Sequence, residues 1–430
     1  MLLAALWISA PLALPQGSLA PTGPPAPTMK SLAQIEPRAP LAALPVTITN
    51  AGSYYLTTNL VGVSGQNGVN LNADDVTLDL NGFALIGVPG SQSGINAASA
   101  RRNLAVRNGV VRGWGQAAVS LQTAGSSQFE DLRVMGNGSG LLAGNQCQVR
   151  NCIVTFNTNT AGISVGDAAL VQDCIVVSNA FRGILAGNDS RIVDCTVLAN
   201  ATGGNDGIAT GRAALVQNCV ASRNGTPAGT QGGGIAVDVG STVIGCTTTS
   251  NAVEGIFAQL DSVVKDSTAR DNDIGISTVG GATIQGCTVA LNYSVGILDE
   301  DGSVIANCTV TENGTGIVAT NQTVVRECAV AWNAGDGILV HEGCQVVENN
   351  CHHNTGTGIR ATSTDNRIDR NLTTLNDTGI RVEDEFNLVL HNQSSNNTNN
   401  FSISAGNALG TIESITSMNT NKNPHANFDF

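Results

Sequence analysis

The sequence predicts an all-β protein, a single right-handed, three-sided parallel β-helix of about 15 coils with a cap at each end. Three repeating features predict this solenoid: a Gly-Ile step about every 21 residues, a cysteine about twelve residues after the glycine, and an asparagine about five residues after the cysteine. Connections between parallel strands are almost always right-handed, which sets the expected hand. One coil is too small to have its own core, so each coil must bury side chains against its neighbours.

The Gly-Ile step marks the coils and recurs, with conservative variants, from Gly68-Val69 to Gly379-Ile380. Successive steps are about 20 or 21 residues apart from Gly255 onward and up to about 27 apart before it. All of this variation lies between the asparagine of one coil and the glycine of the next, as between Asn224 and Gly234. One turn in each coil therefore tolerates insertions, and the other turns do not.

The asparagine column indicates how the coils are held together. Three short β-branched runs per coil, separated by Gly, Asn and Asp, are typical of a three-sided stack of parallel strands about 4.8 Å apart. At that spacing the carboxamides can hydrogen-bond to one another along the axis and satisfy backbone groups at a tight turn. The column contains Asn157, Asn179, Asn200, Asn224, Asn251, Asn272, Asn292, Asn313, Asn333 and Asn354.

The cysteines are predicted to be buried, unpaired thiols rather than disulfides. Eight of the eleven share one column, and neighbours about 4.8 Å apart exceed the usual Cβ separation of a disulfide. These eight are Cys152, Cys174, Cys195, Cys219, Cys246, Cys287, Cys308 and Cys328. Cys147, Cys344 and Cys351 lie off the column. Cys351 with His352 and His353 could form part of a metal site, although no second ligand pair has zinc spacing and ordinary coil packing is the alternative.

Composition and charge exclude several classes of partner. Charged residues make up 12% and aromatic residues 3% of the chain, which contains 50 glycines. The net charge of −13 disfavours nucleic acid and anionic membranes as partners, because both need clustered Lys and Arg. A polyanionic glycan would also be repelled unless cations bridged it.

The N-terminal segment predicts a secreted or cell-surface protein. Residues 1–20 are interpreted as a signal peptide, because an apolar run too short to span a bilayer ends near small residues. The run lacks a basic start and precedes Pro21, so a disordered N-terminus or a start placed too far downstream is the alternative. Residues 21–45 form a Pro/Ala-rich lead-in, 46–400 the β-helix and 401–430 a C-terminal cap. No run of eighteen apolar residues occurs after residue 20, so we expect no membrane insertion.

The repeat resembles a known family. The Gly-Ile step, the Cys-x-Val-x-x-Asn pattern and the opening segment Asp74-Asp75-Val76-Thr77-Leu78-Asp79-Leu80-Asn81-Gly82 look like the right-handed parallel β-helix repeat proteins of the pectate-lyase-like superfold. The resemblance covers about residues 46 to 400. It implies the fold but not one activity, because the superfold includes polysaccharide lyases, hydrolases, epimerases and phage tailspikes.

Candidate catalytic residues lie on one outward face toward the C-terminal half. In the strand that follows each Gly-Ile step, the second and fourth residues after the glycine should point outward. The second position carries Arg360 and Arg381. The fourth position carries Glu300, His341 and Glu383. The last three should lie two coils apart, about 9.6 Å per step, near the upper range for inverting glycosidase carboxylates. Arg360 would lie between them and could anchor a substrate carboxylate.

Candidate metal ligands accompany this face. Asp299 occupies an inward, otherwise apolar column, so we expect a raised pKa, a partner or a local slip in register. Asp301, Glu342 and Asp384 follow the outward column by one residue. The family resemblance implies that acidic residues hold Ca²⁺, for which Glu300, Glu383 and Asp301 are candidates, and that an arginine, Arg360 or Arg381, acts as the base. No motif of a specific lyase matches, and the cofactor stays unknown, with Ca²⁺ as the candidate.

Two alternatives weaken the assignment of these charges to a site. Charged side chains on an exposed sheet are most often solvated and without a specific role. The apolar column Phe257, Leu298, Val318 and Leu339 could be a sugar platform, a protein interface or a surface covered by the C-terminal segment. A second candidate site lies at the edge of the long turns and contains Arg182, Asp206 and Glu254.

The sequence therefore leaves two functions open. The first is a secreted β-helix protein that binds or processes polysaccharide or a cell-surface glycan on an outward sheet face. The second is a structural or adhesive surface solenoid without catalytic activity. If the protein is an enzyme, a polysaccharide lyase or a glycoside hydrolase is expected. The absence of long loops in the coils of Glu300, His341 and Glu383 disfavours catalysis, and the substrate and oligomeric state are not determined by the sequence.

Overall fold

The structure is a computed structural model that describes residues 35–200, 205–226, 232–414 and 423–429. The chain divides into two compact units, residues 1–38 and residues 39–430. Only residues 35–38 of the first unit are described, and there Arg38 pairs with Glu36 at 2.8 Å. The predicted signal peptide and most of the lead-in lie outside the described residues. Among the described residues no helix is long and apolar enough to cross a membrane.

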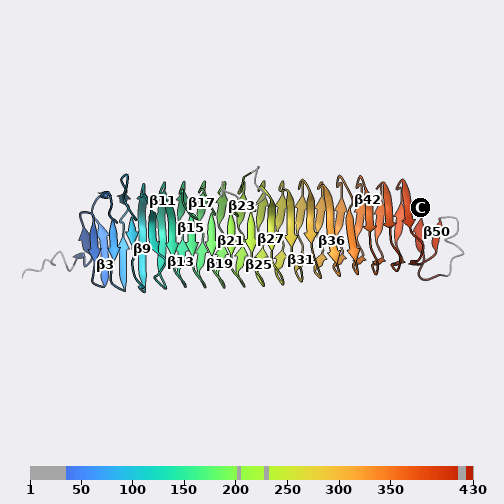
Figure 1. Ribbon diagram of the computed structural model, residues 1–430, viewed down its shortest axis with the longest axis horizontal. Helices are drawn as coiled ribbons and strands as arrows, with labels where there is room; N and C mark the ends of the chain where they lie inside the picture. The colour runs from blue at the N-terminus through green and yellow to red at the C-terminus, as the bar shows by residue number, and fades with distance from the viewer. Residues whose placement is uncertain (1–34, 201–204, 227–231, 415–422, 430) are drawn as a thin grey trace, which may run out of the picture. The chain divides into compact units, whose positions relative to one another are not determined.

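The second unit is a parallel β-solenoid whose coils follow one another along an axis in chain order (Figure 1). The strands that follow the Gly-Ile steps form one sheet of 17 strands, called here the Gly-Ile sheet. Its strands are β2 (Val46–Ile48), β5 (Val69–Leu71), β8 (Ile95–Asn96), β10 (Ala117–Leu121), β12 (Ser139–Ala143), β15 (Ile163–Val165), β18 (Ile184–Ala186), β21 (Ile208–Thr210), β24 (Ile235–Val237), β27 (Glu254–Ala258), β30 (Ile274–Thr278), β33 (Val295–Asp299), β36 (Thr315–Asn321), β39 (Ile338–Glu342), β42 (Thr357–Ala361), β45 (Thr378–Val382) and β48 (Asn399–Ile403).

The other two faces of the solenoid belong to a 34-stranded sheet. The second face contains β1 (Ala39–Leu41), β3 (Gly52–Leu56), β6 (Val76–Asp79), β13 (Gln148–Arg150), β16 (Leu170–Gln172), β19 (Arg191–Val193), β22 (Leu215–Gln217), β25 (Thr242–Ile244), β28 (Val263–Lys265), β31 (Thr283–Gln285), β34 (Val304–Ala306), β37 (Val324–Arg326), β40 (Gln345–Val347), β43 (Arg367–Asp369), β46 (Leu388–Leu390) and β49 (Ala408–Leu409). The third contains β4 (Leu60–Val61), β7 (Ala84–Ile86), β14 (Ile153–Thr155), β17 (Ile175–Val177), β20 (Thr196–Leu198), β23 (Val220–Ser222), β26 (Thr247–Thr249), β29 (Thr268–Arg270), β32 (Thr288–Ala290), β35 (Thr309–Thr311), β38 (Ala329–Ala331), β41 (Asn350–His352), β44 (Leu372–Thr374), β47 (Gln393–Ser395), β50 (Ile412–Ser414) and β51 (Asn427–Asp429). Two long strands, β9 (Leu104–Arg112) and β11 (Gln128–Met135), run along both faces.

The predicted fold class is confirmed, and the coil count is slightly larger than predicted. The Gly-Ile sheet has 17 strands, whereas the repeat predicted about 15 coils. The two additional coils lie at the ends, where β2 pairs Val46 with Val69 and β48 pairs Phe401 with Ile380. The glycine of the step is replaced there by Pro45 and by Asn400, so the pattern did not identify these coils.

The asparagine column forms a continuous ladder of hydrogen bonds, as predicted. Asn313 is typical: its Oδ1 accepts the backbone N–H of Asn292 at 3.0 Å and the Nδ2 of Asn292 at 2.8 Å. Its own backbone N and Nδ2 donate to Oδ1 of Asn333 at 2.9 and 3.1 Å, and Nδ2 also donates to the carbonyl of Val289 at 3.2 Å. The ladder extends from Asn137 to Asn397. In each buried turn the asparagine carboxamide thereby accepts hydrogen bonds from the backbone and side-chain N–H groups of the coil before it.

The other two turns of each coil have their own columns. The cysteine column continues as Asn349, Asn371, Asn392 and Asn427, which bond to one another as in the first ladder. The third column holds small residues and ends in another asparagine ladder, which contains Asn366, Asn387 and Asn407. The sequence pattern missed this third column because Ser, Ala, Thr, Cys and Asn alternate in it.

All eleven cysteines are unpaired and buried, as predicted. Within the column each thiol donates to a backbone carbonyl two residues earlier, as Cys174 does to Gln172 at 3.2 Å. Cys147 and Cys344 belong to the third turn column. Cys351 is in register with Val330 and points into the core, so it lies on the opposite side of its strand from His352.

At the C-terminal end, β51 pairs between β47 and β50 and thereby continues the third face. A buried carboxylate, Asp369, accepts hydrogen bonds there from Arg367 at 2.6 Å and from Nδ1 of His391 at 2.7 Å. Nε2 of His391 lies 2.8 Å from the carbonyl oxygen of Pro424, which precedes β51. His391 thus links the buried carboxylate to the segment that leads into the last strand.

Replacing Asn313 with alanine removes the acceptor for two donors of Asn292 and leaves Asn333 and Val289 short of donors. We expect the free energy of unfolding to fall by about 3 kcal/mol, because the remaining groups stay buried. Guanidinium denaturation measures the change. The exposed Asn321→Ala is the control, and an equal effect of both substitutions would contradict the role of the ladder.

The thiols should be unreactive in the folded protein. Burial raises the pKa of the Cys147 thiol to about 12, and burial likewise raises the pKa of Cys351. Because the thiolate is the reactive form, we expect a maleimide at mildly alkaline pH to label none of the cysteines before denaturation and all eleven after it. Mass spectrometry counts the labels, and rapid labelling of the native chain would contradict the buried column.

Asp369→Asn should destabilise the C-terminal coils in a pH-dependent manner. Burial alone would raise the pKa of Asp369, but the hydrogen bonds from Arg367 and His391 and the charge of Arg370 hold it below its ordinary value. A carboxyl group whose pKa is lower in the folded than in the unfolded chain stabilises the fold at pH values above its unfolded-state pKa. This stabilisation is lost as the pH falls through the folded-state pKa. We expect a loss of about 2 kcal/mol at neutral pH that shrinks below about pH 4. Denaturation across this pH range tests it against the exposed Asp365→Asn, and a pH-independent difference would contradict it.

Candidate functional site

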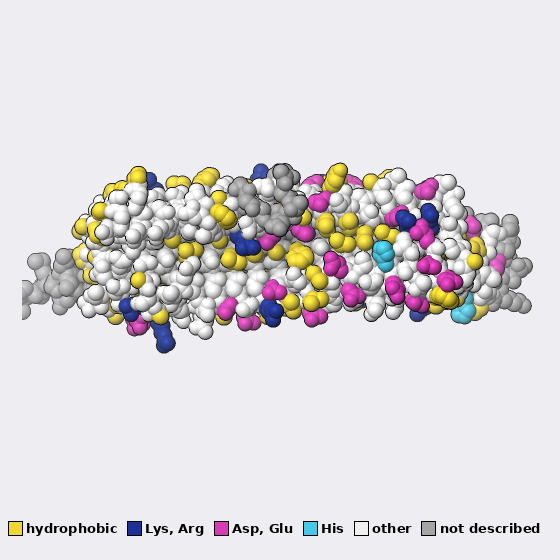
Figure 2. Space-filling model, viewed as in Figure 1, with side chains coloured by type: hydrophobic (Ala, Val, Ile, Leu, Met, Phe, Trp, Pro, Cys, Tyr) yellow, Lys and Arg dark blue, Asp and Glu magenta, His cyan; other side chains and the backbone are white. Residues whose placement is uncertain are grey.

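The outward face of the Gly-Ile sheet changes character along the axis. The second residue after each glycine is small or aliphatic in the middle coils, as at Ser164, Leu185, Ala209 and Ala236. From β27 onward this register column reads Phe257, Ser277, Leu298, Val318, Leu339, Arg360, Arg381 and Ser402. Figure 2 shows hydrophobic side chains along the middle of this face, followed by a group of charged side chains toward the C-terminal end.

Arg360 and Arg381 are held by carboxylates. Arg360 donates through Nε and Nη2 to the two oxygens of Glu383 at 3.1 and 3.3 Å, and its Nη1 lies 3.4 Å from Oδ2 of Asp336. Arg381 pairs with Glu383 through Nε at 2.8 Å. The structure thus brings three of the five candidate catalytic residues together, and it adds Asp336, which comes from the turn before β39 and was not among the candidates.

This pairing reinforces the positive charge of Arg360. Burial alone would lower its pKa, but the charges and hydrogen bonds of Glu383 and Asp336 outweigh that effect and raise the pKa above its ordinary value. Arg360 is therefore a cation and a hydrogen-bond donor.

Glu300 and His341 do not join this cluster. The register of β33 through β45 places Glu300, Thr320, His341, Thr362 and Glu383 in one outward column, as predicted. Glu300 and His341 are exposed, and Nδ1 of His341 lies 3.1 Å from the hydroxyl of Thr362. Glu300 and Glu383 are four coils apart, about 19 Å at the usual strand spacing. That separation is too large for the two carboxylates to act on one glycosidic bond.

The four candidate metal ligands lie in different surroundings. Asp299 is fully buried in register with Thr278 and Ala319, and it accepts hydrogen bonds from the hydroxyls of Thr278, Ser303 and Thr323 at 2.7, 2.6 and 2.5 Å. The three hydroxyls are its partners, and the register does not slip.

The other three candidates, Asp301, Glu342 and Asp384, are exposed and lie two coils apart, about 9.6 Å per step, with Glu342 at the end of β39 and the other two just after their strands. Within the described residues no three His, Cys, Asp or Glu side chains lie close enough together to hold a metal ion.

The second candidate site is only partly described, because residues 201–204 and 227–231 of its long turns lie outside the described residues. Asp206 accepts the backbone N–H of Gly233 at 2.9 Å. Burial raises the pKa of Glu254, and the charges of Asp206 and Asp273 raise it further. Arg182 lies two residues before β18, at the position equivalent to Asp206 in the preceding coil.

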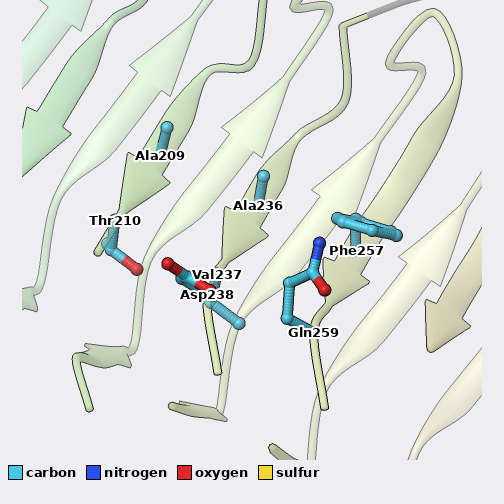
Figure 3. Close-up of a pocket in the computed structure, with 7 residues that line it drawn as sticks. All are labelled: Ala209, Thr210, Ala236, Val237, Asp238, Phe257 and Gln259. Atoms are coloured by element: carbon cyan, nitrogen blue, oxygen red, sulfur yellow. The ribbon is translucent and has the colours of Figure 1, made fainter. Parts of the chain in front are cut away.

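A pocket that the sequence analysis missed lies at the start of the apolar column (Figure 3). Its volume is about 300 Å³, and it spans β21, β24 and β27. Its lining consists of Ala209, Thr210, Ala236, Val237, Asp238, Phe257 and Gln259. Asp238 and Gln259 occupy the same fourth position after the glycine as Glu300 and His341. The sequence signal for this pocket was the pair of polar residues in that outward column. It was overlooked because the other outward residues of these coils are small.

The family follows from a comparison with family models. Residues 46–202, 183–304 and 297–423 match the model described as right handed beta helix region. The chain belongs to this right-handed β-helix family. The match spans nearly the whole described solenoid, and it confirms the resemblance found in the sequence.

Several solved structures are similar to this chain at low sequence identity. The A-module of the Azotobacter vinelandii mannuronan C-5 epimerase AlgE4 has 13% identity and a TM-score of 0.36, with 79% of this chain and 91% of that chain covered. A mannuronic acid specific polysaccharide family 6 lyase from human gut microbiota has 10% identity and a TM-score of 0.34, with 89% and 86% covered. A GH87 alpha-1,3-glucanase from Streptomyces thermodiastaticus has 14% identity and a TM-score of 0.32, with 84% and 62% covered. A search of curated proteins finds no match.

Proposed function

We propose that this β-helix is a secreted or surface protein that binds a polysaccharide along the outward face of the Gly-Ile sheet. The observation that carries the proposal is the half-buried column of Phe257, Leu298, Val318 and Leu339 beside a column of polar side chains. A sugar ring presents a C–H face and a rim of hydroxyls, so it needs an apolar surface next to hydrogen-bonding groups.

The geometry of a solenoid suits a repetitive ligand. Each coil advances the face by about 4.8 Å, which is close to the length of one sugar unit in an extended polysaccharide. Successive sugar units could therefore meet equivalent positions in successive coils. The charged cluster of Arg360, Arg381, Glu383 and Asp336 would lie at one end of this track and offer hydrogen bonds to hydroxyls.

The cluster favours binding over catalysis. A base must be able to lose its proton near working pH, and two carboxylates keep Arg360 charged. Glu383 already pairs with two arginines, and Glu300 is too distant to act with it. These residues therefore serve better as positioned donors and acceptors than as an acid and base pair.

Binding can be tested with a panel of neutral and uronate oligosaccharides, with and without Ca²⁺, by titration calorimetry of the full chain. We expect at least one glycan to bind, and Leu298→Ala and Leu339→Ala each to weaken binding about fivefold to tenfold because half-buried apolar area is lost. Leu185→Ala is the matched control, since Leu185 is a half-buried leucine in the same register column outside the predicted track.

Two outcomes would contradict the proposal. If no glycan binds under any condition, the face is solvated surface and the structural or adhesive solenoid becomes the better interpretation. If Leu185→Ala weakens binding as much as the two test substitutions, the contact lies elsewhere on the solenoid.

A further inference from the structure

The pocket of Asp238, Phe257 and Gln259 carries an inference that rests on the proposed function and narrows its ligand. Three adjacent coils form this pocket, and its volume of about 300 Å³ is at the small end of ligand sites. In Figure 3 the polar ends of Thr210, Asp238 and Gln259 lie along one edge, while Ala209, Ala236 and Phe257 line the rest. A site of this size and make-up suits a single small ring with one apolar face.

The polar groups of the pocket are not fully satisfied by the protein. Thr210 lies in the inward column, in register with the buried Ala186, and its buried Oγ1 is not offered to a ligand. The side-chain amide of Gln259 makes no hydrogen bond within the described residues, and only its backbone N–H is bonded, to the carbonyl of Val237. One oxygen of Asp238 accepts the N–H of Val239 at 2.7 Å, and the other lies 3.8 Å from Nε of Arg212, whose side chain is 72% exposed. That exposed ion pair is weak, so the carboxylate can accept further donors.

Unsatisfied acceptors next to an aromatic ring define the chemistry of the ligand. A carboxylate accepts two hydroxyl groups at once, and an amide both donates and accepts. The ring of Phe257 offers an apolar surface beside them. Vicinal hydroxyls on a sugar ring with a C–H face match this arrangement.

Charge then distinguishes between classes of sugar. The only charged side chain in the lining is the carboxylate of Asp238, and the nearby Arg212 lies outside the lining and is largely exposed, so solvent screens its charge and a uronate placed here would be disfavoured. At the other end of the face the cationic side chains of Arg360 and Arg381 are already paired with Glu383. We infer that the pocket binds one unit of a neutral polysaccharide, with Asp238 accepting two sugar hydroxyls and Phe257 packing against the ring.

The test uses the full chain and two sets of hexasaccharides, one neutral (cello-, malto- and laminari-oligomers) and one acidic (mannuronate and galacturonate oligomers). We expect calorimetry to show binding of at least one neutral oligomer and of neither acidic one. Asp238→Asn keeps the shape but removes the charge and should weaken that binding at least about tenfold. Phe257→Leu keeps an apolar contact but removes the ring and should weaken it about fivefold.

Asp189→Asn is the matched control, because Asp189 is an exposed aspartate in a nearby coil at a turn where asparagine is equally well tolerated. It should leave affinity unchanged. If the protein binds only uronates, or if Asp238→Asn and Phe257→Leu bind the neutral oligomer as tightly as the native chain, the inference fails while the proposed function stands. If no oligosaccharide binds, the proposed function fails.

Discussion

The hydrogen bond between an asparagine of one coil and the turn of the coil before it is the interaction on which the rest of this structure depends. A turn in the interior of a stack has backbone and carboxamide groups that water cannot reach, and each must find a partner. Asn313 does this for Asn292 and is served in turn by Asn333. Because each coil within the ladder is both donor and acceptor, the stack tolerates no shift in register at this turn.

That constraint converts a period in the sequence into columns on the surface. Once the turns are in register, residues at the same offset from the Gly-Ile step lie above one another on the same face. The column from Phe257 to Ser402 is such a set, and so is the column from Glu300 to Glu383. The longest insertions lie in the turn between the asparagine of one coil and the glycine of the next, as between Asn224 and Gly234, so the strands of the Gly-Ile sheet stay in register from coil to coil.

The candidate residues show where the register alone is insufficient. It placed Glu300, His341 and Glu383 correctly in one column, but it did not show that the side chain of Glu383 turns toward Arg360 and Arg381. Asp336 joins Arg360 from a turn in the preceding coil, a diagonal contact that offsets along one strand do not reveal. The sequence identified Asp299 as the one carboxylate in an apolar column. Hydrogen bonds from three hydroxyls in three coils explain how this carboxylate is accommodated in the core.

The sequence by itself determined the fold class, the inward and outward positions, the buried thiols and the asparagine ladder, because these follow from a strict period and the geometry of stacked strands. It missed the end coils at Val46 and Phe401, where the glycine is replaced, and the third turn column, where several small residues serve equally well. Only the tertiary structure decided which charges pair and where a pocket opens. Both depend on how side chains from different coils meet, and the period of a single coil does not contain that information.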